Sequence, residues 1–304
     1  MIANKANKKF KIVAKLFGGL GNQLFIYAAA RRLALFNNSQ LFLDISSGFA
    51  NDHVYKRTCQ LYNFKINAEI CLIKNSNNFL VILLRRFHII INFLIPFKFK
   101  YYIKQNGSNF EIRIFNYKQK YNLYLEGYWQ SERYFADIDN LIRSELEIIP
   151  PTDKTNNVIS NYIKSSVSIC VHIRFFNEDD IQNSLDISNY LIKSFDLVES
   201  RIKNPRYFIF SNDFSRARML SILESRDCTF IDNNLGDDKA YADLWLMTLC
   251  KHHIISNSTF SWWGAWLANN KYGLVISPNT VSRNGVISWG FDGNLPTHWI
   301  KIEV

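Results

Sequence analysis

The chain has 304 residues, 48% of them apolar, which suffices for the cores of two globular domains. Its five cysteines, an odd number without CxxC or metal-ligand spacing, argue against a disulfide framework and favour a reducing compartment. The net charge of +10 lies in the first half: residues 1–150 hold 21 Lys and Arg against 10 Asp and Glu, and residues 151–304 hold 15 against 16. A basic surface attracts nucleic acid, anionic lipid or an anionic ligand, and charge alone does not choose among them.

The first elements follow the order strand, loop, helix, strand. Residues 11–17 predict a buried strand, 18–22 (GGLGN) a tight turn, 23–36 a helix and 40–46 a second strand. The apolar stretch before the turn is too short for a signal peptide or a membrane anchor, so we predict a cytoplasmic protein.

Residues 79–97 are nearly all apolar but carry Arg85, Arg86 and His88 at their centre. Because a spanning helix would bury these charged side chains at the middle of the bilayer, we do not predict a transmembrane segment. A pair of core helices with a basic edge is the expected structure. The alternative is a peripheral contact of residues 79–100 with an anionic membrane surface.

The second half begins after the proline-containing stretch 148–157, which is the best candidate linker. Strands are predicted at 167–176, 206–213, 227–232 and 252–256, and helices near 188–202 and 240–250. Alternating strands and helices predict parallel sheets covered on both faces. The fold class is therefore α/β, with domains at 1–150 and 151–304.

Four polar segments follow predicted strands. They are GGLGNQ (18–23), HIR (172–174), SND (211–213) and SNSTFS (256–261). Since ligands of open α/β sheets bind beyond the carboxyl ends of the strands, these segments form the candidate site.

The segment SNSTFSWWGAWLA (256–268) predicts a strand end followed by a helix start. Ser258, Thr259 and the neighbouring N–H groups would lie at a helix N-terminus, which favours an anion such as phosphate. Simple N-capping is the alternative. The three tryptophans are expected to pack in the core rather than to form a platform for a sugar.

His172 and Arg174 lie on one face of a predicted strand, and arginine suits a diphosphate because its guanidinium presents a fixed fork of donors. A structural salt bridge for Arg174 and a satisfied core position for His172 are the alternatives. GGLGNQL lacks the third glycine of a dinucleotide-binding loop, because Leu24 takes that position, so an NAD site is disfavoured. Asp137 and Asp139 form a D-x-D pattern, but acidic residues are favoured in the first turn of a helix, so we predict no metal.

With these motifs, the sequence resembles glycosyltransferase family 11, the inverting α-1,2-fucosyltransferases that use GDP-L-fucose. The segments FGGLGNQLFIYAAARRLA, EGYWQSERYF (126–135), FSND, KHHIISNSTFSWWGAWLA and PTHWIKI (296–302) carry the resemblance, in order and over nearly the whole chain. The family pattern H-x-R-R-x-D is altered here, because Phe175 and Asn177 replace the second arginine and the aspartate. Because these two replacements remove charged side chains of the family pattern, they can change the affinity for the donor and the identity of the donor.

The resemblance implies a GT-B architecture, with two Rossmann-like domains facing a cleft, the donor mainly in the C-terminal domain and the acceptor on the N-terminal side. It implies no cofactor and no required metal. Arg174 would stabilise the charge on the departing GDP, and Asp243 would accept from the guanine. Candidate bases are Asp44, Glu126 and Glu178. The implied donor contacts are Asn22, Gln23, His172, Arg174, Ser211, Asn212, Asp213, Asp243, Asn257, Ser258, Thr259, Phe260 and Ser261.

The implied partners are GDP-L-fucose and a galactoside acceptor in a surface glycan such as an O-antigen, which can be lipid-linked at the inner face of the membrane. Three alternatives remain: a different nucleotide-sugar donor, a non-catalytic glycan-binding homologue, and a nucleic-acid-binding protein. The last is disfavoured because the polar segments at the strand ends of the neutral half do not serve nucleic-acid binding.

Overall fold

The computed structural model describes residues 10–50, 52–53, 55–72, 91–92, 94–107, 109–175, 187–268, 270, 272–281, 287–289 and 295–303. Glu178 and Asn177 lie outside the described residues, as does most of the segment 79–100. The chain divides into two compact units, residues 1–145 and 146–304.

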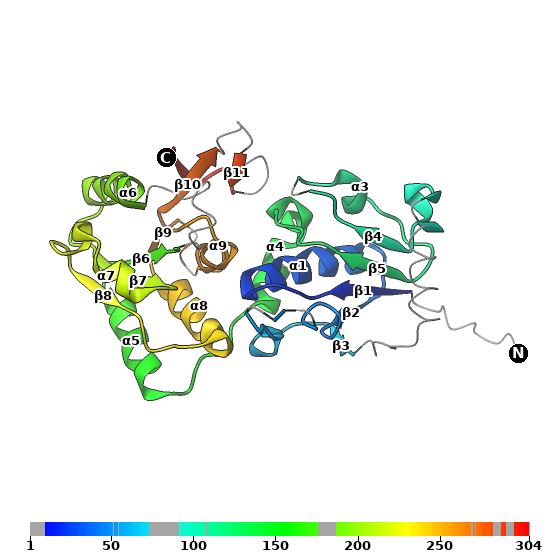
Figure 1. Cartoon of the computed structure of the whole chain (residues 1–304), viewed down its shortest axis with the longest axis horizontal. Helices are drawn as coiled ribbons and strands as arrows, with labels where there is room; N and C mark the ends of the chain where they lie inside the picture. The colour runs from blue at the N-terminus through cyan, green and yellow to red at the C-terminus, as the bar shows by residue number, and fades with distance from the viewer. Residues whose placement is uncertain are drawn as a thin grey trace, which may run out of the picture. The chain divides into compact units, whose positions relative to one another are not determined.

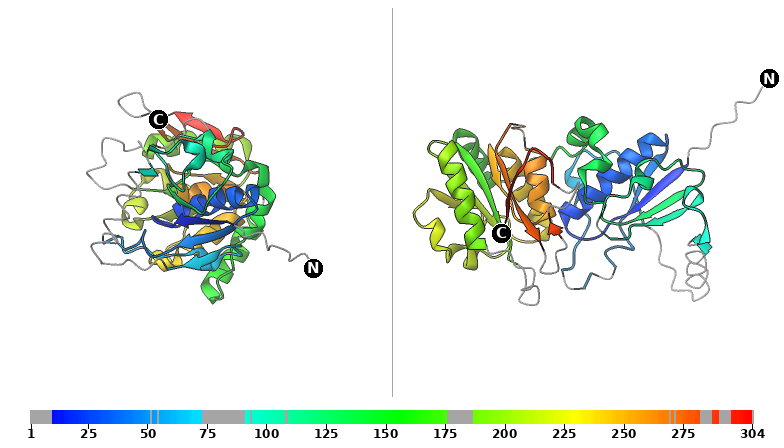
Figure 2. Two further views of the ribbon diagram at one scale, coloured as in Figure 1. Left: turned by 90° about the vertical axis from the view of Figure 1, so that its right-hand side faces the viewer. Right: turned by 90° about the horizontal axis from the view of Figure 1, so that it is seen from above.

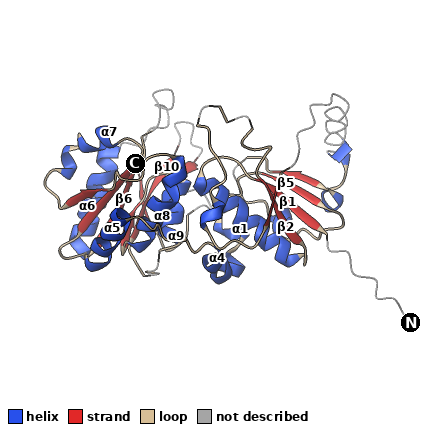
Figure 3. Cartoon of the chain, turned by 90° about the horizontal axis from the view of Figure 1, so that it is seen from below, coloured by secondary structure: helices blue, strands red, loops and turns tan. Residues whose placement is uncertain are grey.

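The first unit is built on a parallel sheet of five strands in the order β3-β2-β1-β5-β4. Its elements are β1 (Lys11–Lys15), α1 (Leu20–Phe36), β2 (Gln40–Asp44), β3 (Glu69–Cys71), β4 (Tyr102–Lys104), α3 (Ile112–Phe115), β5 (Leu123–Glu126) and α4 (Asp139–Glu145), with short 3-10 turns at Leu61–Asn63, Phe97–Phe99, Glu132–Tyr134 and Ala136–Ile138. Figure 3 shows β5, β1 and β2 side by side with α1 against them.

One face of this first sheet forms the core of the unit. Ile12 and Ala14 of β1 are fully buried, as is Leu43 of β2, and along β1 they alternate with half-buried or exposed neighbours. This period of two follows from the pleat of a β-strand. Helix α1 is buried on most of its circumference, because ten of its first eleven residues are buried.

The second unit has a sheet of seven strands in the order β11-β10-β9-β6-β7-β8, with β12 beside β10 (Figures 1 and 2). Its elements are α5 (Lys154–Ser165), β6 (Ser168–Ile173), α6 (Ile187–Arg201), β7 (Arg206–Ser211), α7 (Phe214–Arg218), β8 (Cys228–Phe230), α8 (Ala240–Leu249), β9 (His252–Ile254), α9 (Thr259–Trp266), β10 (Val275–Val281), β11 (Ile287–Trp289) and β12 (Ile300–Glu303), with 3-10 turns at Ser221–Leu223 and Asp237–Lys239. The pairing is parallel except between β10 and β11, so the prediction of a purely parallel sheet is wrong at this edge.

Strand β6 is buried along its whole length, which is typical of a central strand covered on both faces. Ile169, Val171 and Ile173 belong to a core that includes Phe195 of α6. Figure 1 shows α6 on one side of these strands and α5 and α8 on the other. The strands and helices predicted from the periodicity of the sequence are confirmed, with shorter strand ends.

Candidate functional site

The second sheet brings three of the predicted polar segments to one edge. Strands β6, β7 and β9 run parallel, so residues 172–174, 211–213 and 256–261 follow the same ends of neighbouring strands. Hydrogen bonds join these ends: His172 Nδ1 lies 2.8 Å from Ser256 Oγ, and the Phe175 N–H donates to Asn212 Oδ1 at 2.9 Å. We call this region the donor edge.

His172 is held as a neutral imidazole. Its side chain is buried, and its ring centroid lies 5.9 Å from that of Phe260. Burial lowers the pKa of His172 to about 3, and the positive charge of Arg174 contributes to the shift. The imidazole therefore carries no charge near neutral pH, and its bond to Ser256 fits the alternative of a satisfied core histidine.

The start of α9 uses several of its hydroxyl groups internally. Ser258 is the N-cap, and its Oγ accepts from the Phe260 N–H at 3.3 Å. Ser261 is buried and donates to the backbone oxygen of Ser258 at 3.3 Å. In contrast, Oδ1 of Asn257 is buried and accepts no hydrogen bond within the described part of the chain. Capping thus explains Ser258, but it leaves the Asn257 amide oxygen available to a donor group at the helix N-terminus.

The tryptophans of α9 belong to the core, as expected. Trp262 and Trp263 are fully buried and Trp266 nearly so. Their rings pack against one another at centroid distances of 4.9–5.9 Å, and Trp299 lies 5.6 Å from Trp262. This packing fixes α9 so that its N-terminus stays at the donor edge.

The SND segment has structural roles at the end of β7. Asn212 bonds both the N–H and the carbonyl oxygen of Phe175, which ties the residue after Arg174 to the neighbouring strand. Asp213 caps α7 by accepting from the Arg216 N–H at 3.0 Å, and its own N–H donates to Ser211 Oγ. These bonds position Arg174, whereas the predicted direct donor contacts of Ser211, Asn212 and Asp213 remain untested.

Arg174 and Phe175 face different environments. Phe175 is 7% exposed and packs in the core beside Ile173, with the Arg216 guanidinium 4.3 Å from its ring centroid. Arg174 is half-buried directly after β6, on the face that carries His172. An arginine at position 175 would have to bury its charge in this core, which accounts for an apolar residue there.

Asp243 lies in the first turn of α8. Asn234 donates to its Oδ1 at 2.8 Å, and Asn234 is held in turn by the buried Asn156 of α5. Burial raises the pKa of Asp243 to about 7, and the bond from Asn234 opposes that shift. The carboxyl group therefore gains or loses a proton close to neutral pH.

In the first unit, the polar side chains of the GGLGNQ loop form hydrogen bonds with other residues of the same unit. Gln23 is fully buried; its Nε2 donates to the carbonyl oxygens of Gly18 and Thr58, and its Oε1 accepts from the Gln60 N–H. This arrangement does not support the predicted ligand contact of Gln23, because no atom of its amide is left for a ligand. Asn22 is partnered as well, since its Oδ1 accepts from Gln130 Nε2 at 2.8 Å.

Asp44 is enclosed at the end of β2. Its carboxylate is fully buried and accepts from the N–H and Oγ of Ser46, the N–H and Oγ of Ser47, and the Tyr124 hydroxyl, at 2.5–3.2 Å. Burial raises the pKa of Asp44, but these hydrogen bonds outweigh burial and hold it below its ordinary value. A carboxylate with five donors and no exposure is a poor general base, so the prediction of Asp44 as a catalytic base is not supported.

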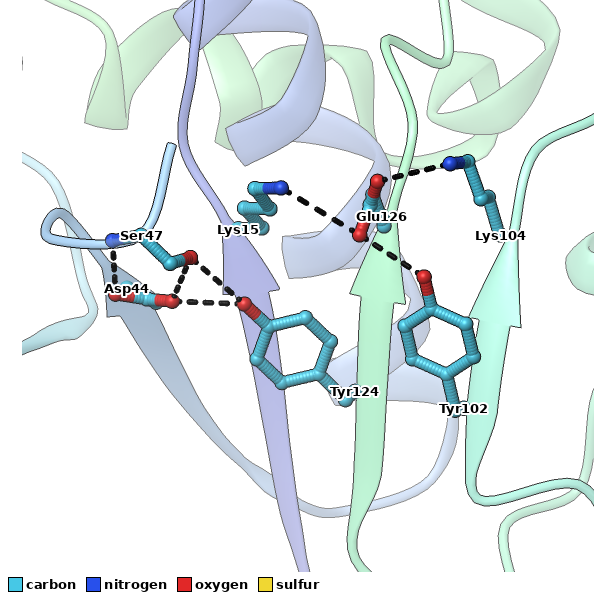
Figure 4. Close-up of polar contacts among 7 residues, drawn as sticks. All are labelled: Lys15, Asp44, Ser47, Tyr102, Lys104, Tyr124 and Glu126. Carbon is cyan, nitrogen blue, oxygen red and sulfur yellow. Dashed lines mark hydrogen bonds and ion pairs between the residues drawn. The ribbon is translucent and has the colours of Figure 1, made fainter. Parts of the chain in front are cut away.

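Glu126 ends β5 in a more open position (Figure 4). It is contacted by the Tyr102 hydroxyl at 2.9 Å, by Lys15 Nζ at 3.5 Å and by Lys104 Nζ at 3.2 Å, and its side chain is 20% exposed. We call these four residues the Glu126 cluster. Burial raises the pKa of Glu126, but Tyr102 and the two lysines outweigh it and hold the pKa below its ordinary value. The sequence had suggested only Glu126, because strand β4, which carries Tyr102 and Lys104, was not predicted.

No group of residues suited to a metal ion occurs among the described residues. Asp137, the first aspartate of the D-x-D pattern, accepts from the Arg32 guanidinium at 2.8–3.0 Å, which is a structural role. No helix in the described part of the chain is long and apolar enough to cross a membrane.

Comparison with known proteins decides the family. The model of glycosyl transferase family 11 matches residues 3–303. The chain belongs to glycosyltransferase family 11. Two curated relatives of this family 11 chain are from Escherichia coli. It is 31% identical to an alpha-1,2-colitosyltransferase, over 96% of this chain and 99% of that protein, and 27% identical to the O-antigen biosynthesis glycosyltransferase WbnK, over 90% and 98%.

The solved structures similar to this family 11 chain include fucosyltransferases. NodZ from Bradyrhizobium has a TM-score of 0.53 at 13% identity, over 84% of this chain and 92% of that chain. A mutant of Arabidopsis thaliana FUT1 in complex with GDP has a TM-score of 0.54 at 14% identity, over 90% and 71%. These similarities show that the fold is α/β of the GT-B type.

Proposed function

We propose that this family 11 enzyme transfers L-fucose from GDP-β-L-fucose to a hydroxyl of a galactoside in a surface glycan, with inversion and an α-1,2 linkage. The observation that carries the proposal is the position of Arg174 at the donor edge, beside the N-terminus of α9, in a chain that matches the family over residues 3–303. The relative WbnK, which is named for O-antigen biosynthesis, supports the class of acceptor.

Arg174 would bind the β-phosphate and stabilise the negative charge that develops as GDP leaves. The N–H groups at the start of α9, the hydroxyl groups of Ser258 and Thr259, and the side-chain N–H groups of Asn257 would donate to the diphosphate, since a helix N-terminus favours negative charge. Asp243 would accept hydrogen bonds from the guanine N–H groups, because a carboxylate can take two at once. These residues would supply the electrostatic stabilisation without a metal ion.

A second donor is favoured by one observation, the 31% identity to an alpha-1,2-colitosyltransferase. Colitose is L-fucose without its 3-hydroxyl group, so one donor pocket can differ between the two sugars by a single hydrogen bond. A site that bonds that hydroxyl discriminates strongly against the deoxy sugar, because the deoxy sugar leaves a buried polar group unpaired. Comparing kcat/KM for GDP-fucose and GDP-colitose decides between the two donors.

The first test is isothermal titration of the full chain with GDP, in EDTA and then with added Mn²⁺. We expect micromolar binding that does not depend on the metal, and binding that Arg174→Ala weakens. Binding only with Mn²⁺ contradicts the metal-free donor site. No binding in either condition favours a non-catalytic glycan-binding homologue.

The first unit would bind the acceptor, which can be lipid-linked. A protein that acts at the inner face of the membrane would use the basic surface of residues 1–150 to reach an anionic membrane. Co-sedimentation with vesicles that contain about 30% phosphatidylserine, close to the charge of a cytoplasmic membrane surface, tests this peripheral contact. If the same amount of protein sediments with neutral vesicles, the contact is contradicted.

A further inference from the structure

A network of asparagine side chains adjoins Asp243 in the second unit. Asn156 lies in the first turn of α5, Asn234 follows β8, and Asp243 lies in the first turn of α8. Helices α5 and α8 pack against each other beside the sheet (Figure 1). In a parallel α/β sheet the helices run antiparallel to the strands, so helix N-termini and the residues that follow strands share one edge. The network therefore lies at the edge of the sheet where ligands bind.

Asn156 and Asn234 form a reciprocal pair of amides. Nδ2 of Asn156 donates to Oδ1 of Asn234 at 2.8 Å, and Nδ2 of Asn234 donates back to Oδ1 of Asn156 at 3.0 Å. The second N–H of Asn156 donates to Oδ2 of Asp153 at 2.8 Å. The second N–H of Asn234 donates to Oδ1 of Asp243, also at 2.8 Å. Both N–H groups of each amide are thus used.

This pairing fixes the direction in which the Asn234 amide points. Asn156 is only 2% exposed, and its backbone N–H donates to Oδ1 of Asp153 at 2.9 Å, so its own position is fixed. If the Asn234 amide turned over, its oxygen would face the Asp243 carboxylate and its N–H groups would face the N–H of Asn156. Both contacts would then be repulsive, so the donor of Asn234 is held toward Asp243.

Asp243 differs from a structural carboxylate of this chain in the charge of its partner. Glu145 pairs with the guanidinium of Arg31 at 2.8 Å. The partner of Asp243 is the neutral Asn234, and Oδ2 of Asp243 accepts no hydrogen bond within the described part of the chain. Burial raises the pKa of Asp243 to about 7, so the one bond from Asn234 does not compensate for the loss of water. The half-buried carboxylate thus has acceptor capacity left for the donors of a ligand.

Guanine suits a carboxylate whose plane is fixed. Its N1–H and 2-amino groups point in the same direction and can donate to the two oxygens of one carboxylate in parallel. Oδ1 of Asp243 keeps a second lone pair beside the bond from Asn234, and Oδ2 is unbonded, so each oxygen can take one guanine donor. Adenine has an acceptor where guanine has N1–H, and hypoxanthine lacks the 2-amino group. A fixed carboxylate therefore distinguishes guanine from both of these bases.

We propose that Asn156 and Asn234 are positioning residues that hold the Asp243 carboxylate in the plane in which it binds guanine, and that they thereby set the preference of this enzyme for a guanine nucleotide. This inference rests on the proposed function, in which Asp243 contacts guanine. Asn234 acts on Asp243 directly, and Asn156 acts through Asn234. Neither asparagine needs to contact the nucleotide.

The first experiment compares Asn234→Ala with Asn233→Ala. Asn233 is the exposed neighbour, and it donates to Asn234 Oδ1 at 3.2 Å rather than to Asp243. Affinities of the full chain for GDP and for IDP, whose base is hypoxanthine, are measured by isothermal titration. We expect the unchanged protein to bind GDP about tenfold more tightly than IDP, the equivalent of one hydrogen bond to a charged group. Asn234→Ala should lower this ratio to about threefold or less, chiefly by weakening GDP binding, and Asn233→Ala should keep it.

The second experiment tests whether Asn156 acts through Asn234. Asn156→Ala should lower the ratio of GDP to IDP affinity, and the double variant with Asn234→Ala should lower it no further than Asn234→Ala alone, because both changes remove the same constraint. Asn157→Ala, at an exposed position of α5, should leave the ratio unchanged. Asn156→Ala also removes a buried polar side chain and should unfold at a lower temperature. The ratio still reports on the site, because an unfolded fraction lowers both apparent affinities equally.

The outcomes separate this inference from the proposed function. If the unchanged protein binds neither GDP nor IDP, the proposed function fails and this inference fails with it. If it transfers fucose from GDP-fucose but binds GDP and IDP equally, the guanine contact of Asp243 is overturned and the transferase function stands. If Asn234→Ala keeps the ratio of the unchanged protein, or weakens both nucleotides by the same factor, the network has a structural role only and the positioning role is overturned.

Discussion

The carboxyl edges of the two sheets differ in how they handle charge. At the donor edge, the polar side chains form neutral pairs, such as His172 with Ser256 and Asn212 with the backbone of Phe175, around the cationic Arg174. At the edge of the first sheet, charges of both signs meet in the Glu126 cluster. The first arrangement suits an anion, because the cationic Arg174 lies near the N-terminus of α9, and the second suits a neutral polyol that needs an ionised acceptor of hydrogen bonds.

The difference indicates that similar α/β frameworks can place opposite chemistry at equivalent edges. In both sheets the strands deliver side chains to one edge, and the residues at the end of each strand or just after it decide the chemistry. The predictions below test this contrast, from the largest expected effect to the smallest.

Removing the charge of Arg174 tests the donor edge. Arg174→Ala should lower kcat by about 10²–10³-fold, because the charge that develops on GDP loses a preorganised partner. Steady-state transfer and single-turnover cleavage of GDP-fucose measure the loss, and Arg216→Ala, which removes the guanidinium 4.3 Å from the Phe175 ring centroid, serves as control. Turnover close to that of the unchanged protein would remove Arg174 from the mechanism.

Phe175 tests whether the altered family pattern is a packing requirement. Phe175→Ala should lower the free energy of unfolding by about 3 kcal/mol, since it leaves a cavity in a core that the phenyl ring now fills. Phe175→Arg should destabilise as well, because it buries a charge without a partner. Urea unfolding checks both variants. A stable Phe175→Arg protein with tighter GDP binding would show instead that the second arginine belongs at this site.

Asp44 and Glu126 should separate under the same substitution. The Asp44 carboxylate accepts five hydrogen bonds, and Asp44→Asn replaces one of its oxygens by an NH₂ group that faces other donors. The substitution should therefore lower the free energy of unfolding by about 2 kcal/mol. Glu126→Gln should change stability little. Unfolding curves and rates of transfer are measured on both variants. A stable but inactive Asp44→Asn protein would contradict the structural role of Asp44.

Asp243 gives a pH test of the donor edge. Its pKa of about 7 means that the carboxyl group becomes protonated as the pH falls through 7, so it loses acceptor capacity and GDP affinity should fall. Asp243→Asn should weaken GDP binding about tenfold at pH 8, the equivalent of one charge-assisted hydrogen bond, and bind with less dependence on pH. GDP affinity of the unchanged protein and of Asp243→Asn is measured by titration from pH 6 to 8. The ionisation of GDP affects both proteins equally, so parallel curves of affinity against pH would argue against a contact between Asp243 and guanine.

The Asp243 carboxyl group should affect stability in the opposite direction: its contribution to stability falls as the pH rises, whereas GDP affinity rises. Because the folded-state pKa of Asp243 lies above the ordinary value of 3.8, its contribution to stability is fully present below that value and is lost as the pH rises through about 7. Asp243→Asn should therefore unfold at a higher temperature than the unchanged protein at pH 8 and not at pH 4. Thermal scans at the two pH values measure this, and an equal shift at both would contradict the burial of the charge.

The sequence alone determined the order of the elements and the place of the polar segments. The short apolar runs in 11–15 and 206–211 and the helical spacing in 240–249 reflect local geometry, so they predict strands and helices without knowledge of the fold. The position of the polar segments at the carboxyl edge of the second sheet followed from that order, because parallel strands end at the same edge.

Only the tertiary structure decided which polar side chains are already bonded. Asp44 meets Tyr124, 80 residues away in sequence, and His172 meets Ser256, 84 residues away. Gln23 is enclosed by the segment 58–60, and the lysines and tyrosine around Glu126 come from two other strands, β1 and β4. No periodicity encodes such contacts, because they depend on which strands become neighbours in the sheet, and that choice fixes the difference between a buried, saturated Asp44 and a reachable Glu126.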